Sequence, residues 1–259
     1  MRVDTLPVSL QRLLQNTSWQ LDTLGMSSAE TYRIVGKENF YLKITPADRW
    51  NSLQKEAKAL TWLRAYLPAP EVIFFERIDE TDYLLMRELP GLPASDDHWK
   101  ANPHQLVKIL AESMLALHNL DSATCPFDQR TDAKLREVAQ YVQLGFVDVD
   151  DFEPENSEQS SQQILDRLYA EQPVQDDLVV THGDFCLPNI VLDNGQLGGF
   201  IDVSSLGVGD RYQDLALCAR SLVQNLGTDQ YNALFFDRYG LTNPDEHKLR
   251  YFRLLDELK

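Results

Sequence analysis

The chain has 259 residues, of which 43% are hydrophobic and 25% are charged. This ordinary globular balance excludes disorder of the whole chain and allows one or two domains. The 40 acidic and 24 basic residues give a formal net charge of −16. A chain this acidic is a poor candidate for binding the phosphates of DNA or RNA, so we expect no nucleic-acid partner.

The cysteines and the apolar runs bear on the environment of the protein. No apolar run approaches the length of a signal peptide core or a membrane helix. The three cysteines, Cys125, Cys186 and Cys218, are too far apart to form a CxxC pair or a disulfide framework. We therefore expect a cytoplasmic protein with reduced thiols and no membrane contact.

The first ninety residues are rich in predicted strands. Two short runs of β-branched and aromatic residues flank a turn at 36–39, which predicts a hairpin. A later stretch carries apolar residues three and four positions apart, as a helix does, and prolines stop it. We expect a small, β-rich N-terminal lobe over residues 1–90. Its expected elements are strands at 31–35 and 40–44, a helix at 52–67, and strands at 72–76 and 82–86.

The segment 89–93, Leu-Pro-Gly-Leu-Pro, is the best candidate for a linker, because Pro and Gly end regular structure. Beyond it the pattern is mainly helical, with one β-rich insertion at 178–202. We expect a larger, mainly helical C-terminal lobe over residues 91–259, and ligand sites often lie at such junctions. The expected elements are helices at 104–119, 132–145, 160–171, 212–226 and 246–257, and strands at 178–181, 190–193 and 198–201.

The most specific motif lies between two predicted strands, at residues 181–189. It reads Thr-His-Gly-Asp-Phe-Cys-Leu-Pro-Asn, so Asp184 and Asn189 are separated by four residues, and Asp202 follows at the end of a later strand. Asp and Asn also favour ordinary turns. Together, however, the three match the catalytic loop and metal-binding Asp of protein kinases, which supply a carboxylate for the hydroxyl proton and oxygen ligands for Mg²⁺.

An upstream pair strengthens this interpretation. Lys43 lies within a predicted strand and Glu56 lies thirteen residues later on the predicted helix. Either residue alone is usually a solvated surface charge. Together they match the kinase arrangement in which a strand lysine holds the ATP phosphates and pairs with a helix glutamate.

With these residues in place, the chain resembles the aminoglycoside 3′-phosphotransferases, a family of bacterial kinase-fold enzymes that inactivate antibiotics. The resemblance runs nearly end to end and implies an α+β, two-lobed, protein-kinase-like fold. The His-Gly-Asp-x₄-Asn motif is shared with wider small-molecule kinases such as choline kinases, whereas Cys125-Pro126-Phe127 and Leu254-Leu255-Asp256-Glu257 are narrower signals. Further matching stretches are Gly25-Met26-Ser27, Tyr41-Leu42-Lys43, Leu84-Leu85-Met86, Leu117–Asp121, Val180–Asp184, Gly199–Asp202 and Gly209–Asp214.

The resemblance implies a role for each motif residue. Asp184 is the catalytic carboxylate, and Asn189 and Asp202 hold Mg²⁺. The ATP-binding residues are expected to be Ser27 at the β-phosphate, Tyr41 on adenine, Lys43 and Glu56 at the phosphates, and the main chain around Arg87 and Leu89 at the adenine edge. His182 is expected to orient the loop, because Asp184 already supplies the base.

A cluster of acids points to a cationic substrate. Residues 148–158 contain six acidic side chains, a pattern that also suits a solvated loop. By resemblance this loop is a substrate lid, and clustered carboxylates attract and orient the ammonium groups of an aminoglycoside. The implied substrate-binding residues are Asp151, Glu153, Glu155, Arg220, Asp256, Glu257 and Lys259, the last through a chain-end carboxylate.

Three positions depart from the family pattern. Ser204-Ser205 stands where many members have Gly-Arg, and Pro154 replaces an acid found in some members. Lys259 stands where an aromatic residue is common, and its ammonium is expected to disfavour a cationic drug.

The sequence predicts an ATP- and Mg²⁺-dependent kinase, a monomer or weak homodimer, that acts on the 3′-hydroxyl of aminoglycosides of the kanamycin and neomycin class. One alternative is a related kinase for a choline-like cationic alcohol or a macrolide. Another is a non-catalytic kinase-like binding module, which the intact set of motif residues argues against. A hydrolase using Cys186 and His182 is disfavoured, because four residues on one loop rarely give nucleophile–base geometry.

Overall fold

The computed structural model describes residues 6–22, 29–47 and 52–259, apart from the side chain of Asp151. It divides into two compact units. The smaller unit comprises the residues up to Gly91 together with Gly198–Ser204, and the larger comprises Leu92–Leu197 and Ser205–Lys259. The sequence suggested two contiguous lobes, 1–90 and 91–259, and did not indicate that residues 198–204 return to the smaller unit.

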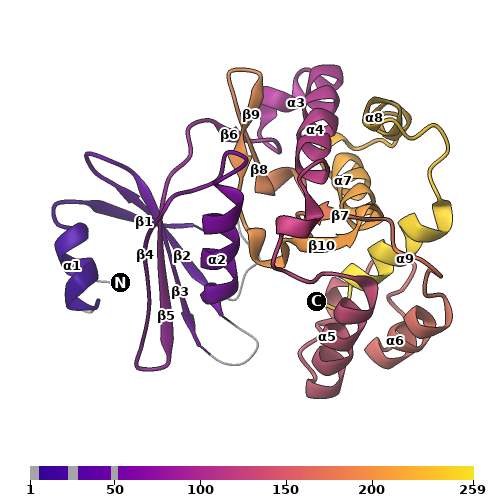
Figure 1. Cartoon of the computed structure of the whole chain (residues 1–259), viewed down its shortest axis with the longest axis horizontal. Coiled ribbons are helices and arrows are strands. Elements are labelled where there is room, and N and C mark those ends of the chain that lie inside the picture. Colours follow the sequence, from indigo (N-terminus) through magenta and orange to yellow (C-terminus); the bar gives the residue numbers. More distant parts are fainter. Residues whose placement is uncertain (1–5, 23–28, 48–51) are drawn as a thin grey trace. The chain divides into compact units, whose positions relative to one another are not determined.

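The smaller unit is a five-stranded antiparallel sheet with a helix on either side (Figure 1). Its strand order, β1-β2-β3-β5-β4, places β3 at the centre. The elements are α1 (Val8–Leu13), β1 (Ser18–Asp22), β2 (Glu30–Val35), β3 (Phe40–Pro46), α2 (Leu53–Leu63), β4 (Val72–Ile78) and β5 (Thr81–Arg87).

The central strand β3 buries both of its faces. Leu42 and Ile44 join a core cluster with Leu10 and Leu14, which lie on and just after α1. Because side chains alternate along a strand, Lys43 points to the opposite face, where α2 packs. The alternation therefore places Lys43 in the interior, between the buried apolar side chains of Leu42 and Ile44 along the strand.

Helix α2 is anchored at its first turn. Ser52 caps the helix by accepting a hydrogen bond from the Gln54 amide. The buried carboxylate of Asp82, on β5, accepts hydrogen bonds from the Ser52 hydroxyl and the Leu53 amide, at 3.1 and 3.0 Å. These bonds fix the start of α2 against the sheet and so fix the direction of Glu56, one turn later.

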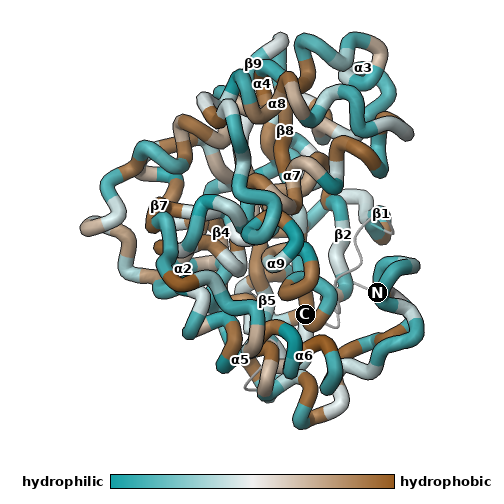
Figure 2. Tube along the Cα trace, turned by 90° about the vertical axis from the view of Figure 1, so that its right-hand side faces the viewer, coloured by the Kyte–Doolittle hydropathy of each residue, from teal (hydrophilic) through white to brown (hydrophobic). Residues whose placement is uncertain are grey.

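The larger unit is mainly helical, with a small amount of sheet. Brown and teal segments alternate along its helices in Figure 2, as expected for helices with one buried face. The elements are β6 (Leu92–Pro93), α3 (Asp97–Lys100), α4 (Pro103–His118), α5 (Thr131–Leu144), α6 (Ser161–Ala170), β7 (Leu178–Thr181), β8 (Ile190–Asp193), β9 (Gln196–Phe200, which runs into the smaller unit), β10 (Gly207–Asp210), α7 (Arg211–Leu226), α8 (Asn232–Tyr239) and α9 (Glu246–Asp256).

Two features of this unit position its polar loop. Strand β7 pairs antiparallel with β10, with Thr181 opposite Gly207. The loop that leaves β7 carries His182, Gly183 and Asp184 and ends in a short 3₁₀ turn at Leu187–Asn189, just before β8. The motif therefore lies between two strands, as the sequence predicted.

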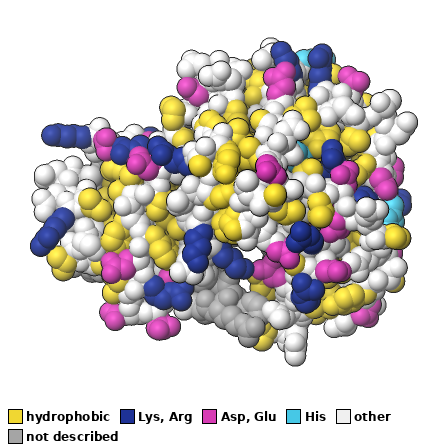
Figure 3. All heavy atoms as spheres, in the orientation of Figure 1, with side chains coloured by type: hydrophobic (Ala, Val, Ile, Leu, Met, Phe, Trp, Pro, Cys, Tyr) yellow, Lys and Arg dark blue, Asp and Glu magenta, His cyan; other side chains and the backbone are white. Residues whose placement is uncertain are grey.

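In residues 6–22, 29–47 and 52–259, no helix is long and apolar enough to cross a membrane. On the face drawn in Figure 3, the Lys and Arg side chains lie interspersed with Asp and Glu side chains. The acidic excess of the chain is therefore not gathered into one patch on that face.

Candidate active site

A buried ion cluster lies in the smaller unit. The ammonium of Lys43 lies 2.7 Å from Glu56 Oε1 and also contacts the carboxylate of Asp202. Lys43 and Glu56 are buried, whereas the Asp202 side chain is 45% exposed. The structure thus brings together three residues that the sequence singled out, separated by up to 159 positions.

The electrostatics of this cluster keep the lysine charged. Burial by itself lowers the pKa of Lys43, but the negative charges of Glu56 and Asp202 outweigh burial and the net shift is upward. Burial raises the pKa of Glu56, and the Lys43 ammonium opposes that rise. A fixed, buried ammonium with one exposed carboxylate partner is suited to bind a phosphate group that competes for it.

The segment 198–204 is attached to the smaller unit by backbone contacts. The Phe200 amide donates to the Pro68 carbonyl at 3.1 Å. Two residues later Asp202 adopts a positive φ of 55°, a conformation that non-glycine residues rarely take and that occurs preferentially at functional sites. The backbone bond and the turn together aim the Asp202 carboxylate at Lys43.

The remaining residues expected at the nucleotide are placed as follows. Tyr41 is half-buried on the same face of β3 as Lys43. The Arg87 amide donates to the Glu71 carbonyl at 2.9 Å, so this amide is already engaged within the sheet and is not available to adenine. The expected phosphate-contacting residue, Ser27, lies outside the described residues.

In the larger unit, Asp184 is held by its own loop. Asn189 Nδ2 donates to Asp184 Oδ2 at 2.8 Å and to the Asp184 carbonyl at 3.0 Å. The Cys186 thiol lies 3.1 Å from the other carboxylate oxygen. Burial raises the pKa of this thiol and the charge of Asp184 raises it further. Cys186 is thus held as a thiol that donates to Asp184, which is the opposite of what a thiolate nucleophile needs.

The loop also depends on Gly183. This residue has a φ of 83°, and a Cβ at this position would overlap the carbonyl oxygen of Ser205. Any other residue here would displace the loop that carries Asp184.

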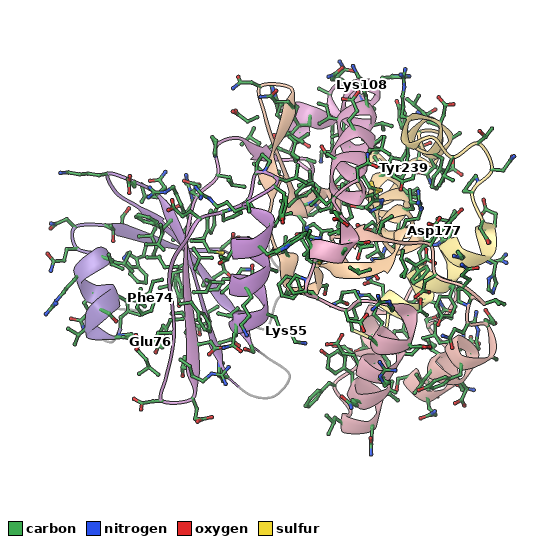
Figure 4. All side chains as sticks on the ribbon, viewed as in Figure 1. Lys55, Phe74, Glu76, Lys108, Asp177 and Tyr239 are labelled. Carbon is green, nitrogen blue, oxygen red and sulfur yellow. The ribbon has the colours of Figure 1, made fainter. Side chains whose placement is uncertain are left out.

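Asp214, on α7, is the main support of this loop, and the sequence marked it only as the end of the matching stretch Gly209–Asp214, without a role. Its buried carboxylate accepts hydrogen bonds from the amides of His182 and Gly183, at 2.7 and 2.9 Å. His118 Nε2 lies 3.0 Å from the same carboxylate, and His118 Nδ1 lies 2.7 Å from the hydroxyl of Tyr239, which is labelled in Figure 4. His182 contacts the loop with its main chain and its side chain, because its Nδ1 also accepts a hydrogen bond from the Asp184 amide at 3.3 Å.

Each of the two residues expected to hold a magnesium ion carries an oxygen donor. Mg²⁺ prefers oxygen ligands, and the two expected ligands offer an amide oxygen at Asn189 and a carboxylate at Asp202. Asn189 directs its amide nitrogen to Asp184, which leaves the amide oxygen pointing elsewhere. No group of three or more His, Cys, Asp or Glu side chains in the described part of the chain forms a different metal site.

Acidic and basic side chains of the C-terminal region form a second cluster in the larger unit. Asp256 accepts from Arg220 Nη2 at 2.5 Å and from Lys259 Nζ at 3.1 Å. Lys259 Nζ also donates to the carbonyl of Gly183, at 3.2 Å, which connects the cluster to the Asp184 loop. Burial raises the pKa of Asp256, but the two cations outweigh burial and hold the pKa below its usual value.

The acidic loop contributes to this cluster through Glu153 and Asn156. The Glu153 amide donates to Glu257 at 3.2 Å, and Asn156 Nδ2 donates to the same carboxylate at 2.8 Å. Glu153 Oε1 lies 3.6 Å from Arg220 and, among the described residues, has no hydrogen-bond partner. Glu155 is exposed, and the side chain of Asp151 lies outside the described residues. The sequence missed Asn156, which carries no charge pattern to signal it.

The chain is similar to known phosphotransferases over nearly its whole length. A family model described as the phosphotransferase enzyme family matches residues 20–252. Aminoglycoside 3′-phosphotransferases of Niallia circulans and Enterococcus faecalis are 37% and 34% identical to the chain, over 97% and 96% of it and 96% of each relative. The chain belongs to this phosphotransferase family. The resemblance to aminoglycoside 3′-phosphotransferases is therefore confirmed, and the protein is a phosphotransferase enzyme.

Solved structures agree with the fold of this phosphotransferase. A crystal structure of an aminoglycoside 3′-phosphotransferase of type VIII matches 97% of both chains with a TM-score of 0.87 at 30% identity. An aminoglycoside phosphotransferase of the 3″ class from Streptomyces rimosus matches 96% of this chain and 95% of that chain, with a TM-score of 0.85 at 28% identity. The predicted α+β, kinase-like fold is confirmed.

Proposed function

We propose that this phosphotransferase moves the γ-phosphoryl group of ATP to the 3′-hydroxyl of an aminoglycoside. The observation that carries the proposal is the contact between the Asp184 loop and the C-terminal cluster, through Lys259 and Gly183. It connects Asp256, and with it the acids of the cluster, through one lysine side chain to the loop whose carboxylate would receive the hydroxyl proton. An alcohol that carries ammonium groups fits this arrangement, and the curated relatives named above have the same activity in their names.

Asp184 is proposed to orient the acceptor hydroxyl and to take its proton as the new P–O bond forms. The bond between the γ-phosphorus and the bridging oxygen breaks, and ADP leaves with the bonding electron pair. The bond from Asn189 to Asp184 Oδ2 leaves Oδ1 facing the weak donor Cys186. A substrate hydroxyl displaces such a weak donor easily, because a thiol forms weaker hydrogen bonds than a hydroxyl.

Lys43 is proposed to hold the ATP phosphates, with Glu56 keeping the ammonium in place. Tyr41, the Arg87 carbonyl and the Leu89 amide are proposed to bind adenine, and Ser27 the β-phosphate. Mg²⁺ bound at Asn189 and Asp202 would neutralise charge on the transferred phosphoryl group. The complex of the S. rimosus relative with ADP and streptomycin supports nucleotide use by this fold.

Substrate ammonium groups are proposed to bind at Glu153 and Glu257, with Asp151 and Glu155 contributing from the lid. Asp256, whose two oxygens face Arg220 and Lys259, is proposed to hold Lys259 beside the substrate. Glu153 Oε1 supports this directly, because a buried carboxylate oxygen without a hydrogen-bond partner among the described residues is costly unless a ligand fills the place. Arg220 is proposed to position Asp256 and Glu153 rather than to bind the drug, since its guanidinium contacts both acids.

The deciding experiment measures ADP release by purified protein with ATP, Mg²⁺ and one acceptor at a time. Kanamycin A should be phosphorylated, and NMR of the product should place the phosphate on the 3′-oxygen. Tobramycin, which lacks that hydroxyl, should inhibit competitively without becoming phosphorylated. Turnover of choline or a macrolide but not kanamycin would support the alternative small-alcohol kinase, and turnover of streptomycin alone would support the 3″ class. Tobramycin phosphate in a mass spectrum would contradict 3′ specificity.

Three expectations stay predictions. The chain is expected to be a monomer or weak homodimer and to act in the cytoplasm, where ATP is available. It is expected not to bind nucleic acid, and its net charge of −16 supports this.

A further inference from the structure

The C-terminal cluster contains an ammonium group of the protein itself. Lys259 Nζ donates to the Gly183 carbonyl at 3.2 Å and to Asp256 Oδ1 at 3.1 Å. Its side chain is 25% exposed, about half the exposure of the surface residue Lys108. A lysine held between a loop carbonyl and a carboxylate occupies a position that would otherwise suit a cationic ligand.

The groups around Lys259 come from three elements. Asp256 lies on α9, Asp184 lies on the loop after β7, and Glu137 and Lys134 lie on α5. Burial lowers the pKa of Lys259, but Asp256 and Asp184 outweigh burial and the net shift is upward. The ammonium is therefore charged near neutral pH.

The neighbouring cations are already part of the cluster. Arg220 lies 2.5 Å from Asp256 Oδ2, so both oxygens of that carboxylate face a cation of the chain. Lys134 is buried, and burial together with the charge of Lys259 lowers its pKa. A substrate ammonium that approached Asp256 would therefore meet a carboxylate whose charge the chain already neutralises.

We propose that Lys259 is a specificity-determining residue: its ammonium takes the place of a substrate ammonium beside Asp184 and selects acceptors that carry a hydroxyl next to the reacting one. The inference rests on the proposed function. An ammonium has three donors and no acceptor, and two of the donors of Lys259 are directed at Gly183 and Asp256. The third can donate to a substrate hydroxyl oxygen, whereas a substrate ammonium offers no acceptor and is repelled.

The position of Lys259 limits which substrate group it meets. The reacting hydroxyl must come within hydrogen-bond reach of Asp184, roughly 2.6–3.2 Å. Lys259 contacts the carbonyl of the residue directly before Asp184, and the proposal therefore places its ammonium beside a sugar carbon that flanks the reacting carbon. Kanamycin A and kanamycin B form a matched pair for this test, because they differ only by a hydroxyl or an amine at the neighbouring 2′-carbon.

The experiment compares KM and kcat for the two kanamycins in the wild-type protein and three variants. Lys259→Met removes the charge and keeps the length of the side chain, and Lys259→Arg keeps the charge. Lys108→Met removes one positive charge from the exposed surface of α4 (Figure 4) and serves as the matched control. Thermal melting of each variant checks that it is folded.

The wild-type protein should have a lower KM for kanamycin A than for kanamycin B. Lys259→Met should lower the KM for kanamycin B relative to that for kanamycin A by about tenfold, the effect of one like-charge contact that solvent largely screens. Lys259→Arg and Lys108→Met should keep the wild-type ratio.

An unchanged ratio in Lys259→Met would overturn the proposal. An equal loss of kcat on both kanamycins without a change in ratio would also overturn it, since that result would make Lys259 a support of the Asp184 loop. If wild-type protein phosphorylates neither compound, the proposed function fails, and calorimetric Kd values for the same pair then test Lys259 alone. The inference would be rejected if the ratio of the Kd values for the two kanamycins were the same in wild type and Lys259→Met, or if neither of these two proteins bound them.

Discussion

The substitution Asp214→Asn should destabilise the larger unit and misplace the catalytic loop. The carboxylate accepts from the amides of His182 and Gly183 and from His118 Nε2, at 2.7, 2.9 and 3.0 Å. Asparagine keeps the shape but replaces one oxygen with an NH₂ donor. Whichever way the amide turns, at least one N–H of the loop or of the histidine meets another donor.

The size of the expected loss of stability follows from the burial of Asp214. Asp214 is fully buried, and removing one partner of such a buried charged network costs about 3–5 kcal/mol. For a protein of this size the loss corresponds to a fall in Tm of roughly 6–20 °C. Asp177→Asn is the matched control, because Asp177 (labelled in Figure 4) pairs with Arg211 at 2.7 Å but is about half exposed. Such exposed pairs contribute only about 0.2–1 kcal/mol.

The pH dependence gives the prediction a second test. Burial raises the pKa of Asp214, but the interactions of its carboxylate with His118 and His182 outweigh burial, and the net shift of the pKa is downward. A depressed pKa in the folded state contributes stability that is present above the unfolded pKa of about 3.9 and lost as pH falls through the folded value. The Tm gap between wild type and Asp214→Asn should stay constant from pH 7 to 5 and narrow below about pH 4.

Calorimetric melting at pH 7, 5 and 3.5 measures both effects, and kcat reports the loop. A fall in Tm no larger than that of Asp177→Asn, or a gap that widens toward acid pH, would refute the assigned role of Asp214.

Three further predictions concern the motif residues. Asp184→Ala should abolish phosphoryl transfer and leave ATP affinity nearly unchanged in calorimetry, whereas Asp202→Ala should weaken Mg²⁺-dependent ATP binding as well; the reverse pattern would exchange their roles. Glu56→Gln should raise the KM for ATP by at least about tenfold, because Lys43 loses the ion pair that aims its ammonium; an unchanged KM would mean that Asp202 alone positions the lysine. Cys186 should resist alkylation by iodoacetamide at pH 8 in mass spectrometry, since its raised pKa keeps it a thiol; rapid modification would contradict its placement beside Asp184.

Long, periodic elements were predictable from the sequence, because burial of one face dictates their pattern. The helix expected at 104–119 is α4, Pro103–His118, and the hairpin expected at 31–35 and 40–44 is β2 and β3. The helix expected over 52–67 ends earlier, at Leu63, and continues as turns to Leu67. The short elements α1, β1, α3 and α8 were not predicted, since a few residues carry too little periodicity to be recognised.

Strand β10 was missed for a different reason. Its sequence, Gly-Val-Gly-Asp, has low strand propensity. A Cβ on Gly207 would lie 2.8 Å from the Phe127 carbonyl oxygen, and one on Gly209 would lie 2.6 Å from that of Gln129. Both glycines are needed because another stretch of backbone lies against the strand. Tertiary packing therefore outweighs local preference here, and no local pattern in the sequence reveals it.

The number of acidic residues in the sequence overstates the negative charge available to a ligand at the proposed drug site. The acidic run 148–158 and the terminal acids suggested a strongly anionic pocket, yet the structure pairs most of its central carboxylates with groups of the chain. Asp256 faces Arg220 and Lys259, and Glu257 accepts from Asn156 and a backbone amide. Specificity then depends on the few carboxylate oxygens that stay available and on which cations a substrate must approach. Those pairings form between residues distant in sequence, so the net charge of the chain predicts the class of ligand but not its pattern of amines.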